Sequence, residues 1–134
     1  MEKIKTLMIE PGKEPVIHWL PVSISSFNNA VSKGTYYECT AEVKQIEPGV
    51  YILYADESVT LMFAPNRRLN DSIINGVFYV IGSKDNFPVS LTNSQIRKYQ
   101  DKFGVPEEFS EQEALFHNLN TLCKEIDEMH FKEL

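Results

Sequence analysis

Asn66, Arg67 and Arg68 are the residues of this chain best suited to bind an anion. The planar guanidinium of arginine matches phosphate and carboxylate oxygens two at a time. An asparagine amide can recognise a sugar hydroxyl or the edge of a base. The three residues lie in a polar stretch, residues 64–71, between two apolar runs that predict strands. Because a loop between buried strands is held in place by the core, this stretch predicts a pocket for an anion or a nucleotide.

The same stretch also fits a structural interpretation. One arginine would pair with Asp71 or Glu57, and the other would lie extended at the surface. Thr92 and Gln95 add to the functional alternative, because both would lie at a helix N-terminus and offer further donors to an anion. The sequence leaves the two interpretations open.

Motifs for metal, phosphate-loop or nucleophile-elbow chemistry are missing from the sequence, while its residue order leaves a Ser-His-Asp or Cys-His nucleophile open as an alternative. The histidines and cysteines are not spaced to share a metal ion; they are His18, Cys39, His117, Cys123 and His130. Neither a glycine-rich phosphate loop nor a GxSxG nucleophile motif occurs. We therefore expect a protein that is not an enzyme, with no metal and no cofactor, and with both cysteines reduced.

The negative charge is confined to one end of the chain. Residues 107–134 hold eight acidic residues against two lysines, which accounts for the whole net charge of −6. Residues 1–106 are neutral, so no basic face predicts direct binding to nucleic acid. No apolar run approaches the roughly 20 residues of a membrane span, and the N-terminus lacks the apolar region of a signal peptide. We expect a cytoplasmic protein that contacts no membrane.

The N-terminal third predicts a hairpin and a helix. Residues 3–9 alternate between apolar and polar and predict a strand, which ends in the turn Glu10-Pro11-Gly12-Lys13. Residues 16–20 return beside it, with His18 and Trp19 on opposite faces. Ser23 or Ser25 is a candidate N-cap for a short helix that Gly34 ends.

The middle of the chain predicts further strands. They cover residues 36–44, 50–55, 59–63 and 77–81, and the second is preceded by a turn with the same Glu-Pro-Gly sequence as the first. Residues 64–71 and 83–88 are predicted to be loops because of their composition.

The C-terminal part predicts two helices, each opened by a capping box. Thr92 with Gln95 opens the first helix, whose apolar stripe is Ile96, Tyr99 and Phe103. Ser110 with Glu113 opens the second. We expect residues 1–106 to form the core domain and the acidic helix of residues 107–134 to dock on it or to form the seam of a homodimer. The fold class is then α+β: a mainly antiparallel sheet of about six strands, a short helix after the first hairpin, and two C-terminal helices.

Three segments together resemble a known family of domains of unknown function. They are the Ile9-Glu10-Pro11-Gly12-Lys13 turn, the Pro65-Asn66-Arg67 loop followed by the strand that ends at Gly82, and Ser90-Leu91-Thr92 with Gln95 opening a helix. The resemblance spans residues 4–103. The family is common in phages and in conjugative and other mobile elements, which implies an accessory protein that acts in the cytoplasm of a bacterial host cell. Two departures are the short segment between Val50 and Pro65 and the presence of Arg68.

This context leads to two hypotheses of function. The first is an anti-defence protein that sequesters a small phosphorylated ligand, an ADP-ribose-type or cyclic nucleotide used as an immune signal. Arg67 and Arg68 would hold its phosphates, Asn66 its sugar or base, and Thr92 and Gln95 would add donors. The second is an inhibitor or adaptor that binds a host defence protein through the acidic C-terminal helix, by charge complementarity with a basic groove.

Overall fold

The computed structural model describes residues 2–35, 38–56, 63–70 and 72–119. The elements are β1 (Lys3–Ile9), β2 (Val16–Pro21), α1 (Ile24–Val31), β3 (Ala41–Glu47), β4 (Val50–Ala55), β5 (Pro65–Leu69), β6 (Ser72–Asn75), β7 (Phe78–Lys84), β8 (Phe87–Val89) and α2 (Asn93–Lys102). A further helix, the C-terminal helix, begins at residue 111 and is described as far as residue 119.

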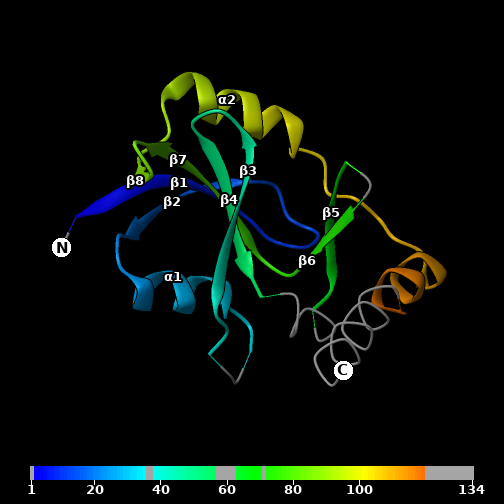
Figure 1. The fold of residues 1–134 in the computed structure, drawn as a ribbon. Helices are drawn as coiled ribbons and strands as arrows, with labels where there is room; N and C mark the ends of the chain where they lie inside the picture. Colours follow the sequence, from blue (N-terminus) through cyan, green and yellow to red (C-terminus); the bar gives the residue numbers. More distant parts are fainter. Residues whose placement is uncertain (1, 36–37, 57–62, 71, 120–134) are drawn as a thin grey trace, which may run out of the picture.

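An antiparallel sheet forms the centre of the fold. Its strand order is β2-β1-β7-β4-β3, and β8 pairs with the end of β7, which makes six strands. The helices α1 and α2 lie on opposite sides of this sheet (Figure 1). The hairpin of β5 and β6 forms a separate two-stranded sheet, and the C-terminal helix lies beyond it. The predicted α+β class, with a mainly antiparallel sheet of six strands and two C-terminal helices, is confirmed.

Two turns with the same Glu-Pro-Gly sequence connect the first pairs of strands. The first is closed by the Lys13 amide, which donates to the Glu10 carbonyl at 3.2 Å, and Gly12 has a φ of +72°. Gly49 takes the equivalent place in the second turn, with a φ of +81°. Only glycine adopts this left-handed conformation without a steric cost, so the local sequence dictates both hairpins.

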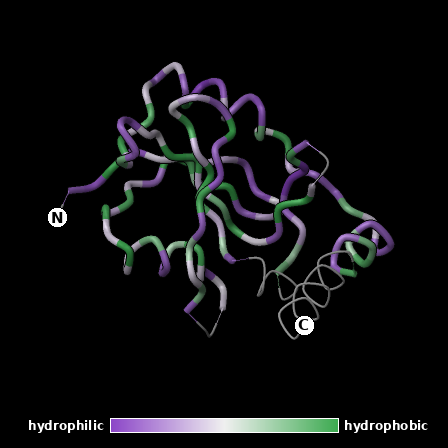
Figure 2. The backbone as a smooth tube through the Cα atoms, viewed as in Figure 1, coloured by the Kyte–Doolittle hydropathy of each residue, from purple (hydrophilic) through white to green (hydrophobic). Residues whose placement is uncertain are grey.

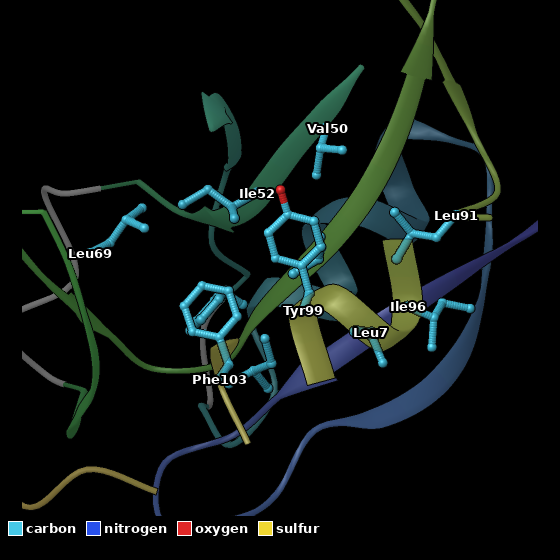
Figure 3. Close-up of a cluster of buried hydrophobic side chains, with 11 residues drawn as sticks. Leu7, Val50, Ile52, Leu69, Leu91, Ile96, Tyr99 and Phe103 are labelled. Carbon is cyan, nitrogen blue, oxygen red and sulfur yellow. The ribbon is translucent and has the colours of Figure 1, made fainter. Parts of the chain in front are cut away.

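The central strands are buried on both faces, and each face packs on one helix. Even and odd residues of a strand point to opposite sides, so β1 sends Leu7 and Ile9 to the α2 side and Ile4 to the α1 side. On the α2 side the core includes Leu7, Val50, Ile52, Leu69, Leu91, Ile96, Tyr99 and Phe103 (Figure 3). Apolar residues gather along the central strands, whereas the outer loops are polar (Figure 2).

Local capping defines where both covering helices begin. The Ser23 hydroxyl accepts a hydrogen bond from the Ser26 amide at 3.0 Å and begins α1. The capping box predicted for α2 is confirmed, because the Thr92 hydroxyl accepts from the Gln95 amide and the Gln95 side chain accepts from the Thr92 amide.

Three details differ from the sequence predictions. The expected loop at residues 64–71 is wrong, because residues 65–69 form β5 and pair with β6. The expected loop at residues 83–88 is wrong as well, since β7 continues to Lys84 and turns directly into β8. The strand expected at residues 36–44 begins only at Ala41. In each case pairing with a neighbouring strand, rather than local composition, decides the conformation. The strand expected at residues 59–63 lies almost entirely outside the described residues.

Candidate functional site

The Arg67 side chain is buried at the junction between β5 and the core. It is 1% exposed, and its five hydrogen bonds equal the five N–H donors of a guanidinium. Nε and Nη2 donate to the Phe103 carbonyl at 3.2 and 3.1 Å, and Nη2 also donates to the Lys13 carbonyl at 2.6 Å. Nη1 donates to the carbonyl and to Oδ1 of Asn66 at 3.1 and 2.8 Å.

Burial disfavours the charged form of Arg67, although a guanidinium stays protonated at neutral pH. Burial lowers the pKa of Arg67, and the negative charge of Glu107 opposes that shift. Its hydrogen-bond acceptors are uncharged carbonyl and amide oxygens, so the guanidinium acts here as a branched donor that joins separate segments of backbone.

Asn66 is used in the same way. Its side chain is fully buried, and Nδ2 donates to the carbonyls of Ile9 at 2.8 Å and Gly76 at 2.7 Å. Its Oδ1 accepts from Arg67. We call Asn66, Arg67 and the backbone carbonyls that they contact the polar hub. The hub joins the end of β1, the first turn, the start of β7 and the end of α2.

Arg68 points the other way and is bound by the acidic C-terminal segment. Its Nη1 donates to Glu107 at 3.0 Å, its Nη2 donates to Glu113, and its amide donates to the second oxygen of Glu107 at 2.6 Å. The guanidinium also lies over the ring of Phe109, 4.5 Å from its centroid. These contacts lower the pKa of Glu113, chiefly through its hydrogen bond to Arg68. The carboxylates thus take the place that a bound anion would occupy on Arg68.

Thr92 and Gln95 lie at the opposite end of α2 from Arg67. They cap its first turn and bond each other, whereas Arg67 reaches the Phe103 carbonyl just after its last turn. The structure therefore brings Asn66 and Arg67 together, but it separates Arg68 from them and places Thr92 and Gln95 elsewhere. The partners predicted for the arginines under the structural interpretation, Glu57 and Asp71, lie outside the described residues.

A second group of polar residues lines an open cleft between α1 and the sheet. The cleft has a volume of about 410 Å³, and we call it the α1 cleft; it is lined by Met8, His18, Leu20, Pro21, Ser26, Asn29, Ala30, Lys33 and Tyr79. This volume falls within the range of roughly 300–1,000 Å³ typical of ligand sites. Sheet residues form one wall and a row of residues along and just after α1 forms the other.

Two rings on the sheet side contact each other. The rings of His18 and Tyr79 have their centroids 5.6 Å apart. The Tyr79 hydroxyl donates to the Ala30 carbonyl at 3.0 Å, which ties the sheet to α1. Burial, followed by the charge of Glu10, raises the pKa of Tyr79 to about 12, so the phenol stays protonated at neutral pH.

His18 is partly buried and lines the α1 cleft, and its ring nitrogens have no hydrogen-bond partner among the described residues. Burial lowers the pKa of His18, and the charges of Lys33 and Lys3 lower it further, so the imidazole is neutral at pH 7. Among the described residues, no side chain or backbone group forms a hydrogen bond with its ring. The Thr6 hydroxyl donates to its backbone carbonyl at 2.6 Å. A neutral imidazole presents one donor and one acceptor to a ligand.

The helix side of the cleft offers one cation and one amide. Lys33 Nζ lies 3.3 Å from Glu10 and 3.7 Å from the sulfur of Met8, and its side chain is about half exposed. The Asn29 side chain is exposed and forms no hydrogen bond with any described residue. Sequence reasoning missed this site because its two walls come from different elements. The signal available was the alternation that places His18 and Leu20 on one face of β2.

Other kinds of site find no support in the described residues. Within residues 2–35, 38–56, 63–70 and 72–119, no three metal-ligating His, Cys, Asp or Glu side chains gather. Over the same ranges no helix is long and apolar enough to cross a membrane.

The protein is a small α+β domain built around a six-stranded antiparallel sheet, and it carries two polar groups, the polar hub and the α1 cleft. Residues 4–104 match the family described as a domain of unknown function, DUF3846, and the chain belongs to that family. This agrees with the span of the resemblance noted in the sequence. No curated protein and no solved structure matches the chain.

Proposed function

We propose that this domain binds a small phosphorylated ligand of nucleotide type in the α1 cleft and acts by sequestering it, without catalysis. One observation carries the proposal: the cleft combines an open volume of about 410 Å³ with side-chain groups that form no hydrogen bond with any described residue. Polar groups that converge on a partly apolar concave surface are the usual features of a small-molecule site.

Each wall of the cleft supplies a different kind of contact. The rings of His18 and Tyr79, with Met8, offer an aromatic and apolar surface for the flat face of a base. Lys33 lies at the edge with a positive charge for a phosphate, and Asn29 can read a base edge or a sugar hydroxyl. Glu10 would exchange its contact with Lys33 for one with solvent when an anion arrives.

The polar hub is a weaker candidate for the same ligand. Each donor of Arg67 already has an acceptor inside the protein, so a phosphate would have to replace several buried hydrogen bonds. Arg68 could receive an anion only after Glu107 and Glu113 leave it. The α1 cleft is therefore the better candidate for the ligand than the arginines.

The finer identity of the ligand is proposed from family context. The resemblance to proteins of phages and mobile elements suggests an anti-defence role in the cytoplasm of a bacterial host cell. For such a role, the proposed ligand is an ADP-ribose-type or cyclic nucleotide that acts as an immune signal.

A calorimetric titration of the purified chain tests this function. The panel contains ADP-ribose, cyclic mononucleotides and cyclic dinucleotides, with adenosine and inorganic phosphate as fragments. We expect one nucleotide to bind, and Lys33→Met to weaken it about tenfold, which corresponds to about 1.4 kcal/mol. Lys98→Met is the matched control, because Lys98 also pairs with a glutamate but lies on α2. Binding that is equally affected by both variants, or no binding at all, would contradict the proposal.

Mass spectrometry of the recovered ligand separates sequestration from turnover. A sequestering protein returns the nucleotide unchanged after prolonged incubation. A new product that forms in proportion to the protein would instead establish an enzyme.

The C-terminal helix supports a second candidate function, the binding of a host defence protein. Leu115, Phe116 and Leu119 are 57%, 70% and 46% exposed, so an apolar surface adjoins the acidic residues of this segment. Exposed apolar side chains beside a charged rim are typical of protein interaction sites. In cross-linking experiments in the host cell, Phe116→Glu should abolish capture of a specific partner, whereas Lys33→Met should not. The reverse pattern would favour the α1 cleft.

A further inference from the structure

The two edge strands of the central sheet differ in how they are protected. The edge strand β3 carries the charged residues Glu42, Lys44 and Glu47, and its register shifts between Gln45 and Glu47. Charges and bulges of this kind prevent an edge from pairing with another strand. The edge strand β2 carries no acidic or basic residue other than His18, which is neutral at pH 7, and its pairing with β1 is regular.

The hydrogen-bond pattern shows which backbone groups of β2 face outward. The Val22 amide donates to the Glu2 carbonyl at 3.0 Å, in register with the pairing of β1 and β2. Hydrogen-bonded and non-bonded pairs alternate along an antiparallel ladder. Every second residue counted back from Val22 is bonded to β1, and His18 is one of them. Ile17 and Trp19 fall between the bonded residues, so their N–H and C=O groups point away from the sheet.

The bonds of Lys5 agree with this pattern. Lys5 lies opposite Trp19 in the register. Its amide donates to the Ser90 hydroxyl and its carbonyl accepts from the Leu91 amide, both at 2.9 Å, so both groups face away from β2. The pair of Lys5 and Trp19 is therefore a non-bonded pair.

The outward-facing residues of β2 also expose apolar side chains. Ile17 is 46% exposed and Trp19 is 54% exposed. They lie on the same face of the sheet, because they are two residues apart on one strand. A strand added at this edge would gain hydrogen bonds and apolar contacts from the same two residues.

The ends of the edge are symmetric. Pro15 and Pro21 each lie three residues from His18, and Ile17 and Trp19 each lie one residue from it. Proline has no N–H, so the two prolines limit outward pairing to Ile17 and Trp19. A second strand of the same sequence, antiparallel and centred on His18, sets proline against proline and Ile17 against Trp19. A shift of this register would set a proline against Ile17 or Trp19 and leave a bond unmade.

We propose that two copies of this chain pair through β2, with a two-fold axis at His18, to form one continuous sheet. A self-complementary surface that meets its own copy is the geometry of a two-fold dimer. The uncharged strand brings no like charges together, and the Trp19 indole of one copy covers Ile17 of its partner. The inference is independent of the function proposed above.

Removal of one outward amide tests the dimer. Ile17→Pro deletes an N–H that bonds no described residue, at a position where an edge strand tolerates proline. The matched control is Val43→Pro on β3, which is 53% exposed and whose amide also faces outward. The Asp56 amide donates to the Thr40 carbonyl at 2.9 Å, in register with the pairing of β3 and β4. Counting alternate residues from Thr40 shows that Val43 points its backbone groups away from β4.

Sedimentation velocity from low micromolar to millimolar concentration is the measurement. We expect a reversible dimer for the wild-type chain and for Val43→Pro, and a monomer for Ile17→Pro, with both variants folded by circular dichroism. A wild-type chain that stays monomeric over this range overturns the proposal. So does a dimer that Ile17→Pro leaves intact.

A cysteine at the axis tests the register and does not rely on proline. Residues opposite each other in a non-bonded pair have Cα atoms about 4.5 Å apart, within the roughly 4.4–6.8 Å of a disulfide. His18→Cys should therefore form an intermolecular disulfide under mild oxidation, mapped between the two copies of position 18 by peptide mass spectrometry. Val43→Cys should not link to itself. If His18→Cys links no faster than Val43→Cys, the proposed register is wrong.

Discussion

The polar hub and the α1 cleft contain similar kinds of residue and use them in opposite ways. In the hub, Asn66 and Arg67 are buried and their donors end on oxygens of the same chain. In the cleft, Asn29 and His18 keep side-chain groups that no described residue occupies. The difference shows that residue type alone does not identify a binding site. What distinguishes the two is whether the hydrogen-bonding capacity is already satisfied within the fold.

Arg67→Met should have the largest effect on this comparison. The variant leaves the buried carbonyl of Phe103 and the partly buried carbonyl of Lys13 without these donors, and each unsatisfied buried group costs roughly 1–3 kcal/mol. We expect the free energy of unfolding to fall by about 3 kcal/mol or more, measured by urea denaturation. Arg67→Lys should recover only part of the loss, because lysine lacks the branched donor geometry. An unchanged stability combined with lost ligand binding would show that the hub is the ligand site.

Asn66→Leu should have the next largest effect. It removes the donors to Ile9 and Gly76 and the acceptor of one Arg67 donor. We expect a loss of about 2 kcal/mol in the free energy of unfolding. Because the two side chains bond each other, the double variant with Arg67→Met should lose less than the sum of the two single variants. Strict additivity would argue that Asn66 and Arg67 do not act as one hub.

Arg68→Met should release the C-terminal segment and leave the hub intact. It removes the ion pairs to Glu107 and Glu113, so hydrogen exchange of residues 111–119 should quicken while exchange in β1 and β7 stays slow. The pKa of Glu113 is lowered in the docked state, so docking is fully favoured above the ordinary pKa and is lost as the pH falls through the lowered one. Exchange that does not respond to acid would show that these ion pairs do not hold the segment.

Asn29→Ala should have the smallest effect on stability. Its side chain is exposed and forms no hydrogen bond within the described chain, so the free energy of unfolding should change by no more than about 0.5 kcal/mol. Ligand affinity should nevertheless fall several-fold in calorimetry. A substitution in the cleft would then change ligand affinity and leave stability almost unchanged, whereas a substitution in the hub would change stability alone. A large loss of stability in Asn29→Ala would remove the contrast.

Local signals in the sequence predicted the fold well. The Glu10–Lys13 turn depends on a proline and a glycine within four residues, and the Thr92–Gln95 capping box spans one helical turn. Interactions at such short separations leave a readable pattern, which is why the hairpin and the start of α2 are confirmed.

The candidate site could not be read in the same way. The acceptors of Arg67 at Lys13 and Phe103 lie 54 and 36 residues away in the chain. No local pattern shows that backbone carbonyls from two distant segments will converge on one guanidinium. The α1 cleft has the same difficulty, because His18 acquires its neighbour Tyr79 only through the order of the strands in the sheet.

The long-range bonds of Arg67 also bear on the order of folding. The guanidinium finds its acceptors only after the first turn is closed and α2 has docked on the sheet. We therefore expect the hub to form on the native side of the folding transition state. Weakening it should accelerate unfolding and leave the refolding rate nearly unchanged. Arg67 would thus contribute mainly to the kinetic stability of the native domain.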